Sequence, residues 1–148
     1  MAGIQRKEKD MENLLRNKAT YCLKYIELKS GYSDDGPAWI GKVMTSRTEN
    51  TVYFNNKAFR KSHGVSGNYY DLETGEEYWI SNVKKDGTDR HWAGHGKIII
   101  DTKIIAEYLV LIDKTCISEK QFIVANIVDQ YPVDRINKLE NQKKNTHE

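Results

Sequence analysis

Two short strands and a tight turn between them are indicated by the stretch Thr51-Val52-Tyr53-Phe54-Asn55-Asn56-Lys57-Ala58-Phe59-Arg60. The β-branched and aromatic side chains on both sides of the turn favour extended backbone. Asparagine tolerates a positive φ, so Asn55 and Asn56 can form a two-residue type I′ turn, a common connection in β-hairpins. The stretch therefore predicts antiparallel strands over residues 51–54 and 57–60.

The same pattern of short strands and turns continues on both sides of this hairpin. Further strands are expected at residues 21–29, 39–45, 69–71, 77–81 and 97–100. Glycine, asparagine, aspartate and proline fill the intervals and break the strands. Short strands repeating every 8–12 residues or so are typical of small all-β folds. The β-rich core over residues 21–100 is therefore predicted to be a small antiparallel β-barrel or a strongly bent sheet of the SH3-like kind.

Helices are expected at both ends of the chain. Residues 1–18 are expected to form a polar helical lead-in with a thin apolar stripe. Asp101 is an N-cap for a first C-terminal helix, because an apolar face at helical spacing follows it. Ser118-Glu119-Lys120-Gln121 has the capping-box pattern and predicts a second helix through Val128. The charged segment after it predicts a short third helix.

The fold class is therefore α+β, with one domain over residues 19–148 that ends in a helical part, 101–143, of two or three helices. Hydrophobic residues make up 39% of the chain and charged residues 30%, as in ordinary globular domains. We expect a cytoplasmic protein without a membrane segment. The chain begins with polar residues, and no apolar run approaches the roughly 20 residues of a membrane helix. Cys22 and Cys116 are expected to be buried as free thiols, as in proteins of a reducing compartment.

Aromatic residues are concentrated in the β-rich core. Twelve of the fifteen lie between residues 21 and 92. Most are expected to fill the barrel interior, because aromatic side chains favour strands and bury a large area. The rings expected there are those of Trp39, Tyr53, Phe54, Phe59, Tyr78 and Trp79. Alternation places some rings outside, where one beside Arg60, Lys84 or Arg90 could stack a base or hold a peptide side chain.

The loop Asp89-Arg90-His91-Trp92-Ala93-Gly94-His95-Gly96 is the main candidate for a site. It combines an arginine, two histidines and a tryptophan between turn-forming residues. His91 and His95 have a spacing that suits metal ligands on a helix, but the two glycines oppose a helix, and a third ligand is not fixed by the spacing. We therefore predict neither a metal nor a cofactor.

Four segments resemble a family of small uncharacterised bacterial proteins. They are residues 25–41, 67–71, 75–81 and 90–94, and the resemblance covers roughly residues 24–110. Some members of that family look to be labelled as the thiamine-dependent 1-deoxyxylulose-5-phosphate synthase. Such an enzyme is several times longer and needs a pyrophosphate- and magnesium-binding segment that this chain lacks. The resemblance implies a stand-alone bacterial module and brings no catalytic residues with it.

The leading functional hypothesis is a binding module rather than an enzyme. Its ligand would be nucleic acid or an acidic protein segment, because arginine and lysine bind phosphate and carboxylate groups while aromatic rings stack. The net charge of +2 is small, and residues 51–100 carry seven Lys or Arg against six Asp or Glu, so the charges alone do not choose between the two ligands. The residues expected at the binding surface are Arg60, Tyr70, Lys84, Lys85, Arg90, His91 and Trp92.

Two alternatives remain open. One is a small enzyme in which His91 is the general acid or base, Asp71 or Asp89 orients it, and Arg90 holds an anionic substrate. The other is a homodimeric adaptor that acts through its C-terminal helices. Apolar residues beyond the need of a core point to that dimer, namely Val110, Leu111, Val124 and Val128.

Overall fold

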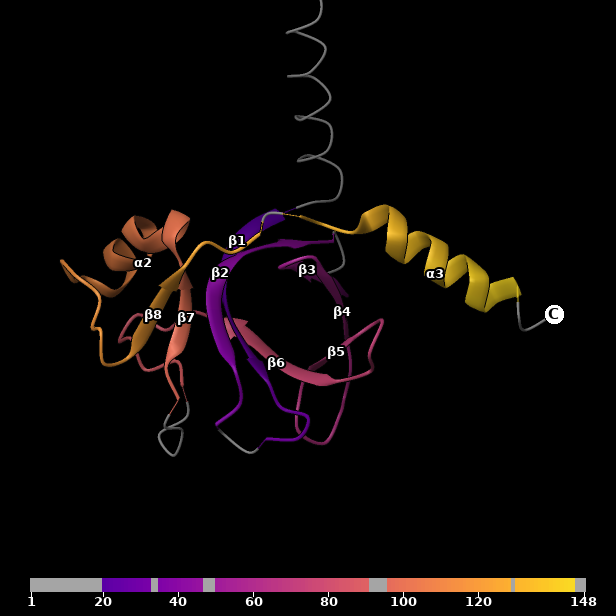
Figure 1. Ribbon diagram of the computed structural model, residues 1–148, viewed down its shortest axis with the longest axis horizontal. Helices are drawn as coiled ribbons and strands as arrows, with labels where there is room; N and C mark the ends of the chain where they lie inside the picture. Colours follow the sequence, from indigo (N-terminus) through magenta and orange to yellow (C-terminus); the bar gives the residue numbers. More distant parts are fainter. Residues whose placement is uncertain (1–19, 33–34, 47–49, 91–95, 129, 146–148) are drawn as a thin grey trace, which may run out of the picture.

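The protein is a closed barrel of six antiparallel strands with a two-stranded extension and two helices (Figure 1). The computed structural model describes residues 20–32, 35–46, 50–90, 96–128 and 130–145. The barrel strands are β1 (Thr20–Leu28), β2 (Ala38–Thr45), β3 (Thr51–Phe54), β4 (Lys57–Lys61), β5 (Tyr69–Asp71) and β6 (Glu77–Asn82). Each pairs with its neighbours along the chain, and β1 pairs with both β2 and β6, which closes the barrel. A small antiparallel barrel is therefore confirmed.

The predicted hairpin forms between β3 and β4. Tyr53 lies opposite Ala58 in the register, and the turn residues Asn55 and Asn56 have φ angles of 51° and 62°. Positive φ at both central residues is the mark of a type I′ turn, whose twist matches that of the strands it joins. Local sequence therefore determines this part of the barrel.

Two further strands extend the sheet beyond β2. β7 (Ile98–Asp101) pairs in parallel with β2, and β8 (Phe122–Ala125) pairs in parallel with β7. The crossover between them is a 3₁₀ turn, η1 (Thr102–Ile104), followed by α2 (Ile105–Ile112). Asp101 caps this turn, since its side chain accepts a hydrogen bond from the Lys103 backbone N–H, as the sequence predicts. α3 (Val133–Asn145) lies on the opposite side of the barrel from α2 (Figure 1).

The helix predicted from Ser118 through Val128 is wrong, because the chain forms strand β8 there. The capping-box residues instead form a turn, in which the backbone N–H groups of Gln121 and Phe122 donate to the Ser118 carbonyl. The β-branched residues that follow pair with the isoleucines of β7, and this pairing outweighs the local helical signal. The described residues thus contain two helices after the barrel. The lead-in predicted over residues 1–18 lies outside them.

Two hydrophobic clusters lie on the two faces of the sheet. The barrel interior is filled by Ile26, Val43, Val52, Phe54, Phe59, Tyr69, Tyr78, Ile80 and Ile127. The second cluster lies between the sheet and α2 and contains Tyr25, Ala38, Ile40, Ile98, Ile100, Ile104, Tyr108, Ile112 and Phe122. Of the six rings expected inside the barrel, Phe54, Phe59 and Tyr78 are there.

The other three rings are less enclosed. Trp39 packs against the barrel cluster and Tyr53 against a small cluster under α3, both half-buried, whereas Trp79 is 42% exposed and its predicted core position is wrong. No helix in the described part of the chain is long and apolar enough to cross a membrane.

Gly41 in β2 allows the barrel to close over Phe54. A Cβ atom at Gly41 would lie 2.6 Å from Cε1 of the buried Phe54 ring. We expect Gly41→Ala to lower the free energy of unfolding by about 1–3 kcal/mol, because overpacking forces the ring from its position. Urea denaturation measures the change. In a Phe54→Leu background, which lacks the ring, the same alanine should cost clearly less, and an equal cost would contradict this explanation.

Candidate functional site

The residues expected at one binding surface lie on two sides of the barrel. Arg60 in β4 contacts Glu140 of α3 and donates from Nε to the Thr51 hydroxyl at 3.0 Å. Tyr70 lies opposite Arg60 in the β4–β5 register. Both therefore belong to the α3 side (Figure 1).

The predicted lysines lie beyond the far end of β6. Tyr70 pairs with Glu77 at the start of that strand, and Lys84 and Lys85 follow its last residue, Asn82. Five residues of extended chain span roughly 16 Å. The structure therefore separates Arg60 and Tyr70 from the two lysines, which are exposed.

Arg90, expected at the surface, is buried instead. Its side chain is 9% exposed, and Nη1 lies 3.9 Å from Oε1 of Glu27. Nη2 donates a hydrogen bond of 3.0 Å to the carbonyl oxygen of Gly36. Arg90 is thus an internal ion-pair partner, and it does not present its charge to a ligand.

Glu27 in β1 is the carboxylate that holds this arginine. The residue is only 1% exposed, although its side chain is charged, and its strand is paired on both edges. Tyr25, on the same face of β1, donates its hydroxyl hydrogen to Oε1 of Glu27, and Lys29 Nζ lies 2.7 Å from Oε2. Burial, and next the hydrogen bond to Glu27, raise the pKa of Tyr25, so the phenol remains a donor at neutral pH. Glu27, Tyr25, Lys29 and Arg90 are called the Glu27 network below.

The Glu27 network fixes the base of the loop singled out in the sequence. Arg90 stands at the first end of that loop and Gly96 at the other, where a Cβ atom would lie 3.3 Å from Nη2 of Arg90. The guanidinium therefore packs against Gly96 at the far end of the loop and against Gly36 of the preceding turn. His91 and Trp92, two of the predicted site residues, lie outside the described residues.

The two aspartates considered for catalysis are placed apart. Asp71 Oδ1 accepts hydrogen bonds from the backbone N–H of Glu73 and Thr74, which organises the β5–β6 turn on the α3 side. Asp89 Oδ1 accepts from the Lys84 backbone N–H at 2.7 Å. Burial raises the pKa of Asp89, and its Oδ2 atom has no hydrogen-bond partner among the described residues. Only Asp89 shares a loop with His91.

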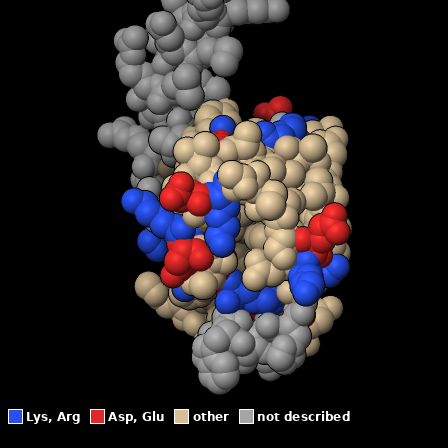
Figure 2. Space-filling model, turned by 90° about the vertical axis from the view of Figure 1, so that its left-hand side faces the viewer, with Lys and Arg blue, Asp and Glu red and all other residues tan. Residues whose placement is uncertain are grey.

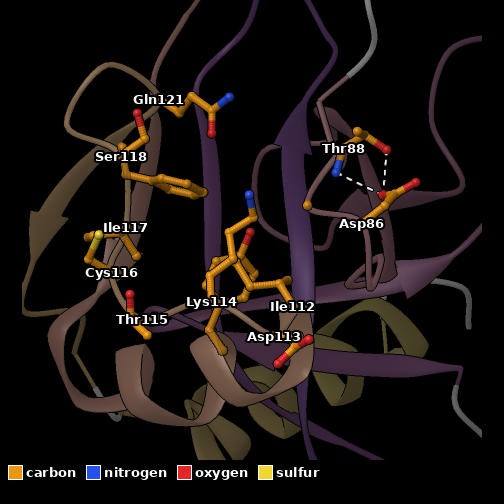
Figure 3. A pocket seen from close by; sticks show the side chains of 13 residues that line it. Asp86, Thr88, Ile112, Asp113, Lys114, Thr115, Cys116, Ile117, Ser118 and Gln121 are labelled. Atoms are coloured by element: carbon orange, nitrogen blue, oxygen red, sulfur yellow. Dashed lines mark hydrogen bonds between the residues drawn. The ribbon is translucent and has the colours of Figure 1, made fainter.

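A pocket of about 510 Å³ lies beside this loop and was not predicted from the sequence (Figure 3). It opens between residues 86–88 and the connection from α2 to β8. Its lining consists of Asp86, Gly87, Thr88, Tyr108, Ile112, Asp113, Lys114, Thr115, Cys116, Ile117, Ser118, Gln121 and Phe122. The sequence feature nearest to it is Tyr108 on the apolar face of α2, and such a tyrosine is usually an ordinary core residue. In the described part of the chain, no three His, Cys, Asp or Glu residues group as metal ligands would.

Comparison with known proteins yields no relative. No family model, curated protein or solved structure matches the chain. The resemblance to small bacterial proteins therefore stays a prediction, and function has to be argued from the geometry.

Replacing Glu27 tests the network. Glu27→Gln keeps the shape of the side chain but removes its charge, which leaves Arg90 and Lys29 without their carboxylate. We expect a loss of about 3–5 kcal/mol in the free energy of unfolding, as for other buried pairs with one partner removed. The matched control is Glu107→Gln, whose ion pair with Lys42 is exposed and should contribute at most about 1 kcal/mol. Equal losses for the two variants in urea denaturation would contradict the role assigned to Glu27.

Proposed function

We propose that the protein is a binding module that recognises an acidic segment of a partner protein through the surface formed by residues 84–96. The observation that carries the proposal is the Glu27 network beneath this loop. A buried ion pair is a weak source of stability, because desolvation offsets most of the attraction between its charges. The contacts of Arg90 with Gly36 and Gly96 therefore support a role in positioning the described parts of this surface for binding.

The lysines of this surface are displayed from an ordered turn. Gly87 has a φ of 75°, and the Asp86 carboxylate accepts hydrogen bonds from the backbone N–H and hydroxyl of Thr88 (Figure 3). The hydrogen bond from the Lys84 N–H to Asp89 closes the turn. Lys84 and Lys85 are both exposed, so their ammonium groups are available to carboxylates. His91 and Trp92 complete the proposed surface.

The charges favour an acidic protein segment over nucleic acid. Each of the three arginines in the described part of the chain already contacts a carboxylate: Arg60 contacts Glu140, Arg90 contacts Glu27, and Arg135 contacts Glu73. Tight binding to nucleic acid requires several phosphates to be neutralised together. Two lysines suit a contact with a few carboxylates better. In the alternative enzyme, Arg90 was expected to hold an anionic substrate, but its guanidinium faces Glu27 instead.

Charge reversal at the lysines tests this function. We expect Lys84→Glu/Lys85→Glu to weaken binding of a fluorescein-labelled poly-glutamate peptide at least tenfold in fluorescence anisotropy. The physical reason is that two attractive contacts become repulsive. The matched control is Lys61→Glu/Lys138→Glu, which makes the same change of charge at two exposed lysines elsewhere and should retain binding.

The same titration is run with single- and double-stranded DNA and RNA. Salt-sensitive binding to one of these, with none to the peptide, would replace the acidic-protein proposal by a nucleic-acid one. Equal loss in both double variants would show that net charge alone decides binding, and the proposed surface would be abandoned.

A second candidate function, self-association through β8, is favoured by the exposure of that strand. β8 is an edge strand, paired on one side with β7 and with no second strand partner among the described residues. Ile123 is 51% exposed and Val124 is 50% exposed, and Val128 and the helical Val110 are exposed as well. Figure 2 shows the face on which α2 and β8 lie, with a broad area free of charged side chains between charged margins.

The occupant that fits this edge is the same strand of a second copy. Residues 121–128 contain no charged side chain, so the side chains of two β8 strands can approach without like-charge repulsion. An antiparallel pair of β8 strands around a two-fold axis would satisfy both open edges with identical contacts. Lysine or proline, which commonly protect edge strands, is absent from β8.

A single charge should abolish such pairing. We expect the wild-type protein to sediment as a dimer and Val124→Lys to sediment as a monomer, because two lysines would be buried together at the two-fold axis. Analytical ultracentrifugation over a range of concentrations measures this. The control is Val65→Lys, a fully exposed valine in the β4–β5 connection. A wild-type protein that stays monomeric at high concentration would end this candidate.

A further inference from the structure

We propose that the face of the barrel under α3 is a binding surface for an amphipathic helix. In this structure α3 occupies the surface, and a helix of a partner protein with the same residue pattern takes its place when α3 leaves. The surface lies over β3, β4 and β5 and uses none of the residues 84–96. The inference therefore does not rest on the proposed function, and its basis is the way in which α3 is held.

The floor of this surface is apolar. It consists of Tyr53, Ala58, Tyr70 and Leu72. Ile136 of α3 packs on this floor and is 1% exposed, and Leu139 packs beside it from the same side of the helix. A helix with two aliphatic side chains three positions apart therefore covers the floor, which is the usual way in which an amphipathic helix binds an apolar surface.

Two groups of opposite charge flank the floor. Glu73 in the β5–β6 turn binds Arg135 of α3, whose Nη2 lies 2.8 Å from Glu73 Oε1 and donates to the Asn56 carbonyl oxygen at 2.8 Å. Arg60 in β4 binds Glu140, further along the same helix. A helix lying in the reverse direction would bring like charges together at both places, so the surface selects one orientation of its ligand.

The barrel itself holds both flanking groups in position. Nε of Arg60 donates a hydrogen bond of 3.0 Å to the Thr51 hydroxyl of the neighbouring strand. The backbone N–H of Glu73 donates to Asp71 Oδ1 at 2.8 Å, which fixes the turn that carries the Glu73 carboxylate. These contacts do not involve α3 and therefore remain when it leaves. A surface whose groups are already in place binds a helix at a smaller entropic cost.

α3 is held weakly on this surface. Among its described side chains only Ile136 is buried, and both of its ion pairs are partly exposed, so each contributes little. Residues 141–143 are exposed, and Figure 1 shows the end of α3 pointing away from the barrel. A helix of 13 residues is only marginally stable in water without tertiary contacts. α3 therefore opens locally while the barrel stays folded.

The segment before α3 keeps the helix close to the surface. Ile127 is buried in the barrel cluster, and the Gln130 carbonyl oxygen accepts a hydrogen bond of 3.0 Å from the Asn56 N–H. This tether gives α3 a high effective concentration at the surface, although its own contacts are few. α3 is thus an internal competitor, and a separate helix binds well only when the docking of α3 is weakened.

The test uses a fluorescein-labelled peptide of residues 130–145 as the partner helix and measures its binding to the full chain by fluorescence anisotropy. We expect Ile136→Asp in the chain to bind the peptide at least tenfold more tightly than the wild-type protein, because the internal competitor is released. The matched control is Asn137→Asp, which adds the same charge at the next, exposed position and should bind as the wild-type protein does.

A charge exchange tests the assigned contacts. In the Ile136→Asp chain, the further change Arg60→Glu should weaken binding of the peptide at least threefold, and a peptide carrying Glu140→Arg should recover it. A purely structural role of Arg60 would not produce this recovery. A peptide that itself carries Ile136→Asp should bind at least tenfold more weakly, because it lacks the side chain that packs on the floor.

Hydrogen exchange of the wild-type protein gives a readout without a ligand. The amides of α3 should exchange at least tenfold faster than those of β1 and β2, because α3 opens without unfolding of the barrel. Thermal unfolding shows whether Ile136→Asp is folded. If it is not, Arg135→Glu/Glu140→Arg takes its place, since this double variant reverses both ion pairs without a change in the core, and the same gain in peptide binding is expected.

The proposal is overturned if the folded variant binds the peptide no better than the wild-type protein, or if the charge exchange brings no recovery. It is also overturned if α3 exchanges as slowly as the barrel strands. A dimer that persists in Val124→Lys and disappears in Ile136→Asp would show that α3 of a second copy, and not a partner protein, is the ligand. None of these results bears on the titrations with acidic peptide, which depend on Lys84 and Lys85.

Discussion

Pairing of β1 on both of its edges is the constraint on which the rest of the structure depends. Residues 24–28 of β1 pair with β6, while the strand as a whole pairs with β2, so a single strand joins the two ends of the barrel. Alternation along it then sends Ile26 into the barrel, and Tyr25 and Glu27 to the outer face. Glu27, which is 1% exposed there, is a charge almost without access to water.

The buried carboxylate in turn determines how the loops nearby are arranged. An unpaired charge at that depth would be prohibitively costly, so the cations of Lys29 and Arg90 have to reach it. Arg90 is the first residue of the loop that ends at Gly96, and its guanidinium also binds the Gly36 carbonyl. The need to pair Glu27 thus brings together Arg90 and the turn at Gly36, which are far apart in the sequence, and the buried pair connects them.

Local signals allowed the barrel to be predicted, and non-local pairing explains where prediction failed. The Asn55-Asn56 turn and the alternation in β5 and β6 depend on neighbouring residues, so these elements could be predicted from the sequence. β8 follows a capping-box pattern and forms a strand only because β7 lies beside it. Arg90 shows the same limit: nothing near it in sequence announces that a glutamate 63 positions earlier is buried beneath it. The burial of Arg90 against Glu27 was therefore not predictable from its own segment, and a binding site in this loop stays a prediction.

The turn over residues 84–89 places its two lysines and the Asp89 carboxylate in opposite environments. Lys84 and Lys85 extend into solvent, whereas the Asp89 carboxylate is drawn inward by its hydrogen bond to the Lys84 N–H. Gly87, with its positive φ, lets the chain reverse between them without a side chain above Tyr108. The turn therefore displays two ammonium groups to solvent while it keeps the Asp89 carboxylate buried. Both features follow from the direction in which a six-residue turn points its side chains.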